Sequence, residues 1–328
     1  MLHELKTSIK NAGETFNYLV KNNGECLVLN YHGVVESITS PRLERNFHGA
    51  SAFISHLKFL KKYKKVISLD ELMQAIDTRQ SLKNCVVLTF DDGYRNNIYA
   101  KELADRTFKT QVPITIFVSA NCVDSERRSI WTVNLSLLLL RGGISQLEFG
   151  GKFFSMNTES ERNVAFNSVR NDLKQKDGIA RQQLLDSIIE QYDSNELEML
   201  VDKYPQFKMM NWDECRQLIS GGCNIESHGL EHEVQNSEQT REILTDEIIK
   251  SKEIISQNTG KEVLSFSYPN GNFSEMSIGI LKNSGYKIAF TTRSGVLSER
   301  AYDEPYLIPR IQPASKLSSF IRGIVEAQ

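Results

Sequence analysis

Short apolar runs alternate with stretches of helical periodicity from Cys26 onward, and this alternation restricts the fold more than any other feature of the sequence. The runs are rich in branched and aromatic residues, as expected of strands that are covered on both faces. Parallel strands linked by crossover helices, an α/β fold, account for the pattern. The predicted strands are CLVLNY (26–31), CVVLTF (85–90), PITIFV (113–118), CNIES (223–227), VLSFSY (263–268) and KIAFTT (287–292).

The alternation stops between residues 122 and 205, where a polar, mostly helical stretch with one hairpin at 147–154 is expected. No repeat, low-complexity tract or linker divides the chain. We therefore predict a single domain over residues 1–328 with an insertion at about 122–205 that packs on the main body. Its apolar part, Trp131 and the leucines at 135 and 137–140, is expected to bury a helix. The alternative is an exposed patch that makes peripheral contact with a membrane.

Composition excludes several partners. A net charge of -2 gives no reason to expect nucleic acid. The longest apolar stretch is far shorter than the ~20 residues that span a bilayer, so no transmembrane segment is predicted. Residues 1–22 lack the uninterrupted apolar segment of a secretory signal, and the five cysteines form no CxxC pair, so a cytoplasmic chain with reduced, buried thiols is expected. The oligomeric state stays open.

Two adjacent carboxylates follow a predicted strand. Asp91 and Asp92 come directly after CVVLTF and are followed by Gly93. Sites of α/β proteins lie at the carboxyl ends of strands, and a turn at Gly93 lets both side chains face one cavity. Close carboxylates repel, and a bound cation relieves the repulsion. An ordinary Asp-Asp-Gly turn is the alternative interpretation.

Two of the six histidines, His228 and His232, stand four residues apart after the run CNIES. On a helical turn this spacing places both imidazoles on one face, about 5 to 6 Å apart, where they can bind one metal ion. Asp92 and the two histidines would then be three protein ligands with an open position, as in catalytic sites. Asp91 is left to accept a proton from the attacking water. A divalent ion is expected, and Zn²⁺, Co²⁺ and Ni²⁺ stay open because these ligands accept all three.

These motifs together resemble the polysaccharide deacetylase family with the NodB homology domain. The resemblance rests on TFDDG (89–93), on the histidine pair and on FSYPNG (266–271), and covers residues 31–34, 86–118 and 212–311 but not the insertion. It implies a distorted (β/α) barrel, a zinc-like ion and removal of acetyl from N-acetylglucosamine-type sugars. It also implies that Asp91 is the base, that Asp92, His228 and His232 are the ligands, and that the backbone N–H of Asn270 stabilises the oxyanion.

The sequence departs from the family's pattern at three places. Gly229 follows the first histidine where a hydroxyl residue is common, so the ligands must be oriented from elsewhere. Ser267 stands where many members carry an arginine that steadies the catalytic aspartate; Arg310 is the expected replacement, with a surface ion pair as its alternative role. No histidine follows His232, so the late histidine that many members use as general acid is missing.

His32 ends the first predicted strand and is the candidate for the missing acid, with a core histidine bonded to backbone as the alternative. His48 and His56 are expected at the surface. The predicted function is a metal-dependent hydrolase that cleaves a carbon–nitrogen bond other than a peptide bond. It would remove N-acetyl from an amino sugar in a polysaccharide, oligosaccharide, or nucleotide- or lipid-linked precursor of a surface polysaccharide. Two rivals are a deacetylase-fold sugar-binding protein without activity and a glycosidase with paired carboxylates, which needs no histidines.

Overall fold

The fold is described from a computed structural model, which covers residues 25–124 and 129–327. Residues 1–22, on which the expectation of a cytoplasmic location depends, lie outside the described residues. All six predicted strands are present, with ends that differ by one or two residues. The strands are β1 Leu27–Tyr31, β2 Gly33–Val35, β3 Phe47–Gly49, β4 Lys65–Val66, β5 Cys85–Phe90, β6 Thr115–Val118, β7 Gln146–Phe149, β8 Lys152–Ser155, β9 Asn224–Ser227, β10 Ser265–Ser267 and β11 Ile288–Phe290.

The main sheet is parallel throughout, in the order β1-β5-β6-β9-β10-β11, with β4 paired to the first residues of β5. The sheet curls, and residues 308–311 bridge its two ends through isolated parallel pairs of Phe290 with Ile308 and of Leu29 with Ile311. Pro309 has no N–H, which explains why residues 308–311 make single bridges and no regular ladder. The α/β fold with a distorted barrel is thus confirmed.

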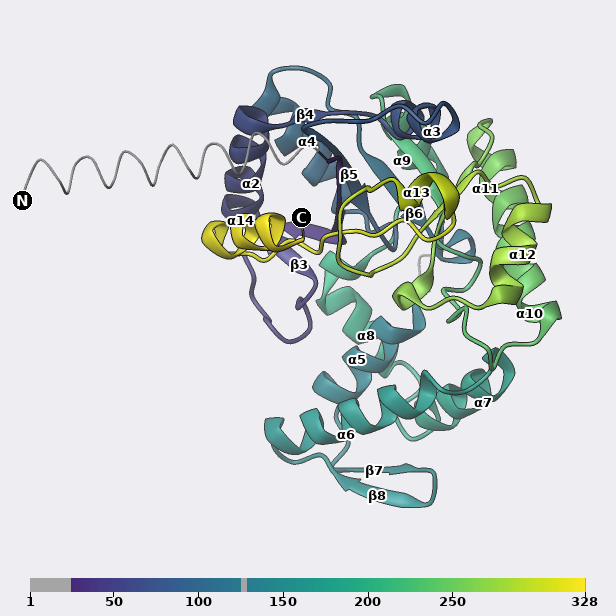
Figure 1. The fold of residues 1–328 in the computed structure, drawn as a ribbon. Helices are drawn as coiled ribbons and strands as arrows, with labels where there is room; N and C mark the ends of the chain where they lie inside the picture. The colour runs from purple at the N-terminus through teal and green to yellow at the C-terminus, as the bar shows by residue number, and fades with distance from the viewer. Residues whose placement is uncertain (1–24, 125–128, 328) are drawn as a thin grey trace, which may run out of the picture.

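Helices surround this sheet (Figure 1). Their bounds are α2 Ala50–Tyr63, α3 Leu69–Asp77, α4 Asn97–Phe108, α5 Trp131–Arg141, α6 Glu159–Leu173, α7 Gly178–Ile189, α8 Glu196–Lys203, α9 Trp212–Ser220, α10 Arg241–Thr245, α11 Ser251–Thr259, α12 Glu275–Asn283, α13 Arg300–Asp303 and α14 Leu317–Glu326. Short 3-10 turns occupy Ala120–Cys122, Pro205–Phe207 and Pro269–Gly271, and a π-helical segment, η3, occupies Asp246–Lys250. The capping box that Asn211 and Glu214 predict begins α9.

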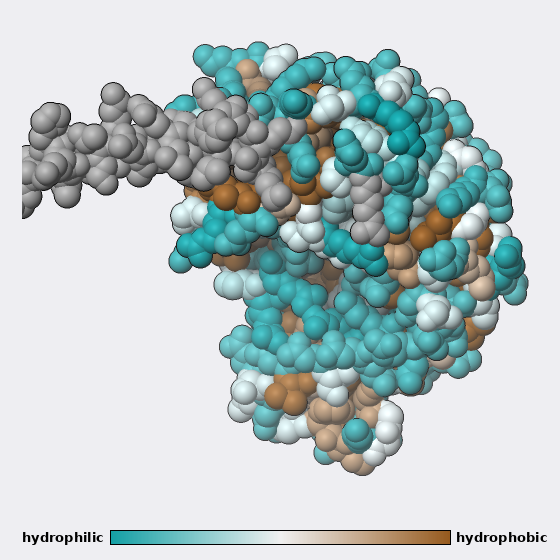
Figure 2. All heavy atoms as spheres, viewed as in Figure 1, coloured by the Kyte–Doolittle hydropathy of each residue, from teal (hydrophilic) through white to brown (hydrophobic). Residues whose placement is uncertain are grey.

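The segment predicted as an insertion contains α5 to α8 and the β7–β8 hairpin, and it lies below the sheet in Figure 1. Its helices share an apolar cluster with Leu43, Phe47 and Tyr94 of the main body. Trp131 and the leucines of α5 are at most 7% exposed, so they bury a helix as expected and do not form the exposed patch that would dock on a membrane. The face in Figure 2 is mostly hydrophilic, with an apolar group at the lower end.

The structure also tests the expectations for the cysteines and for two of the histidines. All five cysteines are buried thiols outside any disulfide, as predicted. His48 and His56 were expected at the surface, and this is wrong: both are buried, 5% and 0% exposed, and His56 stacks on Phe320 of α14, a contact that no local pattern predicts. Burial lowers the pKa of His48 and of His56 to about 4. Among the helices of the described ranges, none combines the length and the apolar character that crossing a bilayer needs.

Candidate metal centre

The aspartate pair lies in a reversal of the chain at the end of β5. Asp92 and Gly93 both adopt positive φ, 76° and 83°. A side chain at Gly93 would approach Val118 of β6 to 2.9 Å, so the turn fits closely against the neighbouring strand. The reversal directs both Asp91 and Asp92 into one pocket, where they are 2% and 4% exposed.

The histidine pair lies in a loop after β9, and the expectation of a helical turn is wrong. Gly229 and His232 have φ of 86° and 60°, values that no right-handed helix contains. The two left-handed residues turn the chain back on itself, so that the rings of His228 and His232 lie 4.9 Å apart between centroids. The spacing of four residues therefore brings the imidazoles together through loop geometry.

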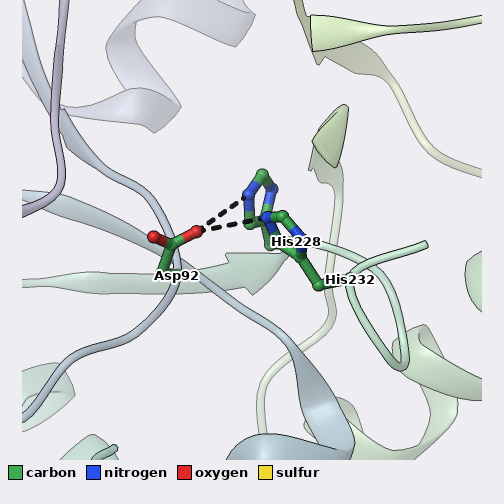
Figure 3. A group of neighbouring side chains, drawn as sticks. All are labelled: Asp92, His228 and His232. Carbon is green, nitrogen blue, oxygen red and sulfur yellow. Dashed lines mark ion pairs between the residues drawn. The ribbon is translucent and has the colours of Figure 1, made fainter. Parts of the chain in front are cut away.

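Asp92, His228 and His232 point toward one another (Figure 3). Nε2 of each histidine lies 3.4 Å from Oδ1 of Asp92, and ligand atoms of all three lie within 4.8 Å of one another. Two atoms that each bind a tetrahedral ion at about 2.1 Å are about 3.4 Å apart, so the measured spacing fits a divalent metal ion such as zinc. All three side chains are buried.

The surroundings act differently on the protonation of the three side chains. Burial works against the charge of His228, but Asp91 and Asp92 outweigh it and raise its pKa. Nδ1 of His228 lies 2.7 Å from the carbonyl oxygen of Ser267, to which it can donate, so that in a neutral ring with this proton Nε2 would carry the lone pair that binds a metal ion. Burial lowers the pKa of His232, and the neighbouring His228 adds to the effect, so that the neutral ring is favoured. Burial works against the charge of Asp92, but hydrogen bonds from the two histidines outweigh it, and the pKa of Asp92 falls well below its usual range.

Glu247 holds the histidine loop in place. It lies in η3, is 2% exposed, and its carboxylate accepts the backbone N–H groups of Leu230, Glu231 and Glu233 at 3.0, 2.8 and 3.2 Å. A Cβ at Gly229 would come within 2.4 Å of this carboxylate. The absent side chain at Gly229 thus makes room for Glu247, a residue that the sequence analysis missed and for which Gly229 was the available signal.

The predicted insertion also contacts this loop. Nε1 of Trp131 donates to the carbonyl oxygen of His232 at 3.2 Å. Arg181 of α7 is buried, lies 5.1 Å over the Trp131 ring and forms an ion pair with Glu233. Residues far apart in sequence therefore fix the backbone on either side of the second histidine.

Asp91 is paired with Arg310. The guanidinium donates to both carboxylate oxygens, at 2.8 and 2.6 Å, and Arg310 is 1% exposed, so the surface ion pair considered for it is not formed. Ser267 accepts from Arg310 at 2.9 Å and donates to Asp91 at 3.1 Å. Burial alone would raise the pKa of Asp91, but Arg310 and then His228 outweigh it and bring it to about 2. Asp91 is therefore ionised at neutral pH.

His32 and Asn270 line the same pocket as the aspartates. His32 is half-buried, and its Nδ1 has no hydrogen-bond partner among the described residues, which argues against a core histidine bonded to backbone. Asn270 has φ of 56°, and the next residue, Gly271, approaches Thr292 so closely that a Cβ would lie 1.9 Å from its Oγ1. The turn that carries Asn270 is thus held against the loop after β11.

Comparisons with known proteins agree with this architecture. The family model described as polysaccharide deacetylase matches residues 166–289, which include both histidines and Asn270. The match begins inside the segment that the motifs placed outside the resemblance, and it does not reach the aspartate pair. No curated protein sequence matches the chain significantly.

Several solved structures have the same fold. The Streptococcus pyogenes deacetylase PplD in complex with acetate is 14% identical, with a TM-score of 0.57 over 92% of this chain and 97% of that one. IcaB from Ammonifex degensii is 16% identical, with a TM-score of 0.57 over 93% and 97% of the two chains. A de-N-acetylase from Aggregatibacter actinomycetemcomitans is 16% identical, with a TM-score of 0.55 over 91% and 99%. The family match and the shared fold together confirm the resemblance to the polysaccharide deacetylase family that the motifs indicated.

Proposed function

We propose that the chain is a metal-dependent hydrolase that removes the N-acetyl group from an amino sugar. The observation that carries this proposal is the 3.4 Å spacing of Asp92 Oδ1 from Nε2 of both histidines, in a pocket that also holds the ionised Asp91. Two proteins of the same fold support the reaction type: a deacetylase in complex with acetate and a de-N-acetylase. Zinc is the proposed ion, and cobalt or nickel would suit the same ligands.

Each residue of the pocket has a proposed part in the reaction. Asp92, His228 and His232 would hold the ion, which when bound polarises the acetyl carbonyl and makes water easier to deprotonate. Asp91 would accept the proton of the attacking water, while Arg310 and Ser267 fix the direction of its carboxylate. The backbone N–H of Asn270 would donate to the carbonyl oxygen as it gains negative charge, a contact typically worth about 3 kcal/mol.

The leaving nitrogen must receive a proton as the C–N bond breaks. We propose His32 as the donor, because it lines the pocket of Asp91 and its Nδ1 is free of partners among the described residues. A His32→Ala variant should lose about 10²- to 10⁴-fold in turnover and keep its metal, since His32 is separate from the three ligands. Steady-state kinetics measures the turnover of the variant, and elemental analysis measures its metal content. Wild-type turnover in the variant would remove His32 from the mechanism.

The proposed reaction has a direct test. Purified protein incubated with N-acetylglucosamine, its oligomers and UDP-N-acetylglucosamine should release acetate from at least one of them, and a metal chelator should abolish the release until Zn²⁺, Co²⁺ or Ni²⁺ is restored. Release that resists the chelator would contradict a metal mechanism. Tight sugar binding without any acetate would instead indicate a binding protein, and stoichiometric metal in the purified chain would argue against a glycosidase.

A further inference from the structure

Basic side chains gather on the solvent side of the pocket. Arg42 and Arg45 precede β3 and line the pocket, where Arg45 is exposed although the metal centre is buried. The guanidinium of Arg170, on α6, lies 5.3 Å over the ring of Phe166, which also lines the pocket. Lys174 follows one turn later as the C-cap of α6. We call Arg42, Arg45, Arg170 and Lys174 the cationic rim.

The cationic rim has no acidic partner among the described residues. Nε of Arg42 and Nε of Arg170 are buried and make no hydrogen bond. Glu44, the acidic residue nearest Arg42 and Arg45 in the sequence, directs its carboxylate to the backbone of Thr39 and Ser40 and to the side chain of Gln206. Asp172, which stands between Arg170 and Lys174, is paired with Lys176. The positive charges of the rim are therefore not compensated from within the chain.

Three other buried cations are paired with carboxylates, unlike the rim, although Nζ of the buried Lys64 also makes no hydrogen bond to the described residues. Arg310 is matched by Asp91, Arg181 by Glu233, and Lys101 by Asp105. The rim cations also repel one another: burial, then Arg170 and Arg45, lower the pKa of Lys174 to about 8, and burial, then Arg170 and Arg42, lower the pKa of Arg45. Removing charge from water without a partner is costly, so an uncompensated cluster at a pocket fits an anionic ligand.

We propose that the cationic rim binds a phosphate group carried by the amino sugar, so that the substrate is a phosphate-linked sugar and not a neutral polymer. This inference rests on the proposed function, because it places the acetyl group at the metal centre and the phosphate toward the solvent side. Guanidinium groups match the oxygens of phosphate in geometry and charge. A neutral polysaccharide offers no group for such a cluster, and a chain of net charge -2 has no general affinity for nucleic acid.

Kinetics with matched substrates test this inference. Acetate release is compared for N-acetylglucosamine oligomers, UDP-N-acetylglucosamine and N-acetylglucosamine on a short prenyl diphosphate. We expect the phosphate-linked substrates to have the higher kcat/KM, falling as salt rises. The two phosphate-linked arms show whether a nucleotide or a lipid carrier is preferred. In the double variant Arg42→Gln/Arg45→Gln, KM for the preferred phosphate-linked substrate should rise at least about 10-fold, whereas KM for the neutral oligomers should change little.

Lys176→Gln is the matched control. Lys176 lies close to the rim in sequence but is 3.6 Å from Asp172, its ionic partner, so the variant removes one positive charge without touching the rim. Calorimetry with UDP, which cannot be deacetylated, gives a second readout: the wild-type chain and Lys176→Gln should bind it, and the double arginine variant should bind it at least about 10-fold more weakly.

The outcomes separate the two proposals. Equal kcat/KM for neutral and phosphate-linked substrates, unchanged in the double variant, would overturn the rim inference and leave the deacetylase function intact. If no substrate of either class releases acetate, the proposed function fails, and UDP binding that does not depend on Arg42 and Arg45 would then overturn the rim inference as well.

Discussion

Asp91→Asn is expected to lower the turnover of acetate release by about 10²- to 10⁴-fold while the metal content stays at the wild-type level. Asparagine keeps the shape of Asp91 but cannot accept a proton from water at neutral pH. Asp91 is not among the three side chains whose ligand atoms converge, so binding of the proposed metal ion should not depend on its charge. Turnover with the preferred substrate and elemental analysis of the same sample measure the two effects.

Asp92→Asn provides the contrast, because the Oδ1 atom of Asp92 is the oxygen that both histidines face. This variant should lose metal and activity together, whereas Asp91→Asn should lose activity alone. Since Asp91→Asn leaves Arg310 without its anionic partner, both variants are assayed well below their unfolding temperatures. Loss of metal in Asp91→Asn, or wild-type turnover in it, would contradict the division of labour between the two aspartates.

Arg310→Met is expected to destabilise the chain by about 3 to 5 kcal/mol, because it leaves the carboxylate of Asp91 buried and unpaired. Methionine fills much of the same volume, so the loss reports the ion pair more than a cavity. The hydrogen bonds from Arg310 to Thr89 and Ser267 disappear as well. Urea unfolding, compared at constant m value, gives the change in the free energy of unfolding.

The double variant Asp91→Asn/Arg310→Met shows whether Arg310→Met destabilises the chain by breaking the buried ion pair or by disrupting the packing around it. Removing both charges leaves no uncompensated ion, so the double variant should be more stable than the sum of the single losses predicts. Its turnover should stay low, because the proposed base is still absent. Additive losses of stability, or a single-variant loss below about 1 kcal/mol, would show that the contact of Arg310 with Asp91 is not an energetically coupled pair.

Local pattern was enough for the strands and for the motifs that follow them. The apolar run that ends at Phe90 is a strand because its branched and aromatic residues are buried on both faces, and β9, which ends at Ser227, is buried around Ile225. Parallel strands place their carboxyl ends together. Asp92 and the histidines therefore meet at one edge of the sheet, as the sequence predicted. The error on the histidine loop was local too, since the sequence does not reveal that His232 takes a positive φ.

What the sequence by itself determined is the curled parallel sheet and the chemistry of the residues at its carboxyl edge, because periodicity and residue type act over a few neighbouring positions. Only the tertiary structure decided which residues distant in sequence contact the residues at that edge. Arg310 reaches Asp91 because residues 308–311 bridge the two ends of the sheet. The carboxylate of Glu247 occupies the space that a side chain at Gly229 would take, because η3 lies against the histidine loop. Such contacts depend on packing between segments far apart in the chain, which no local pattern records.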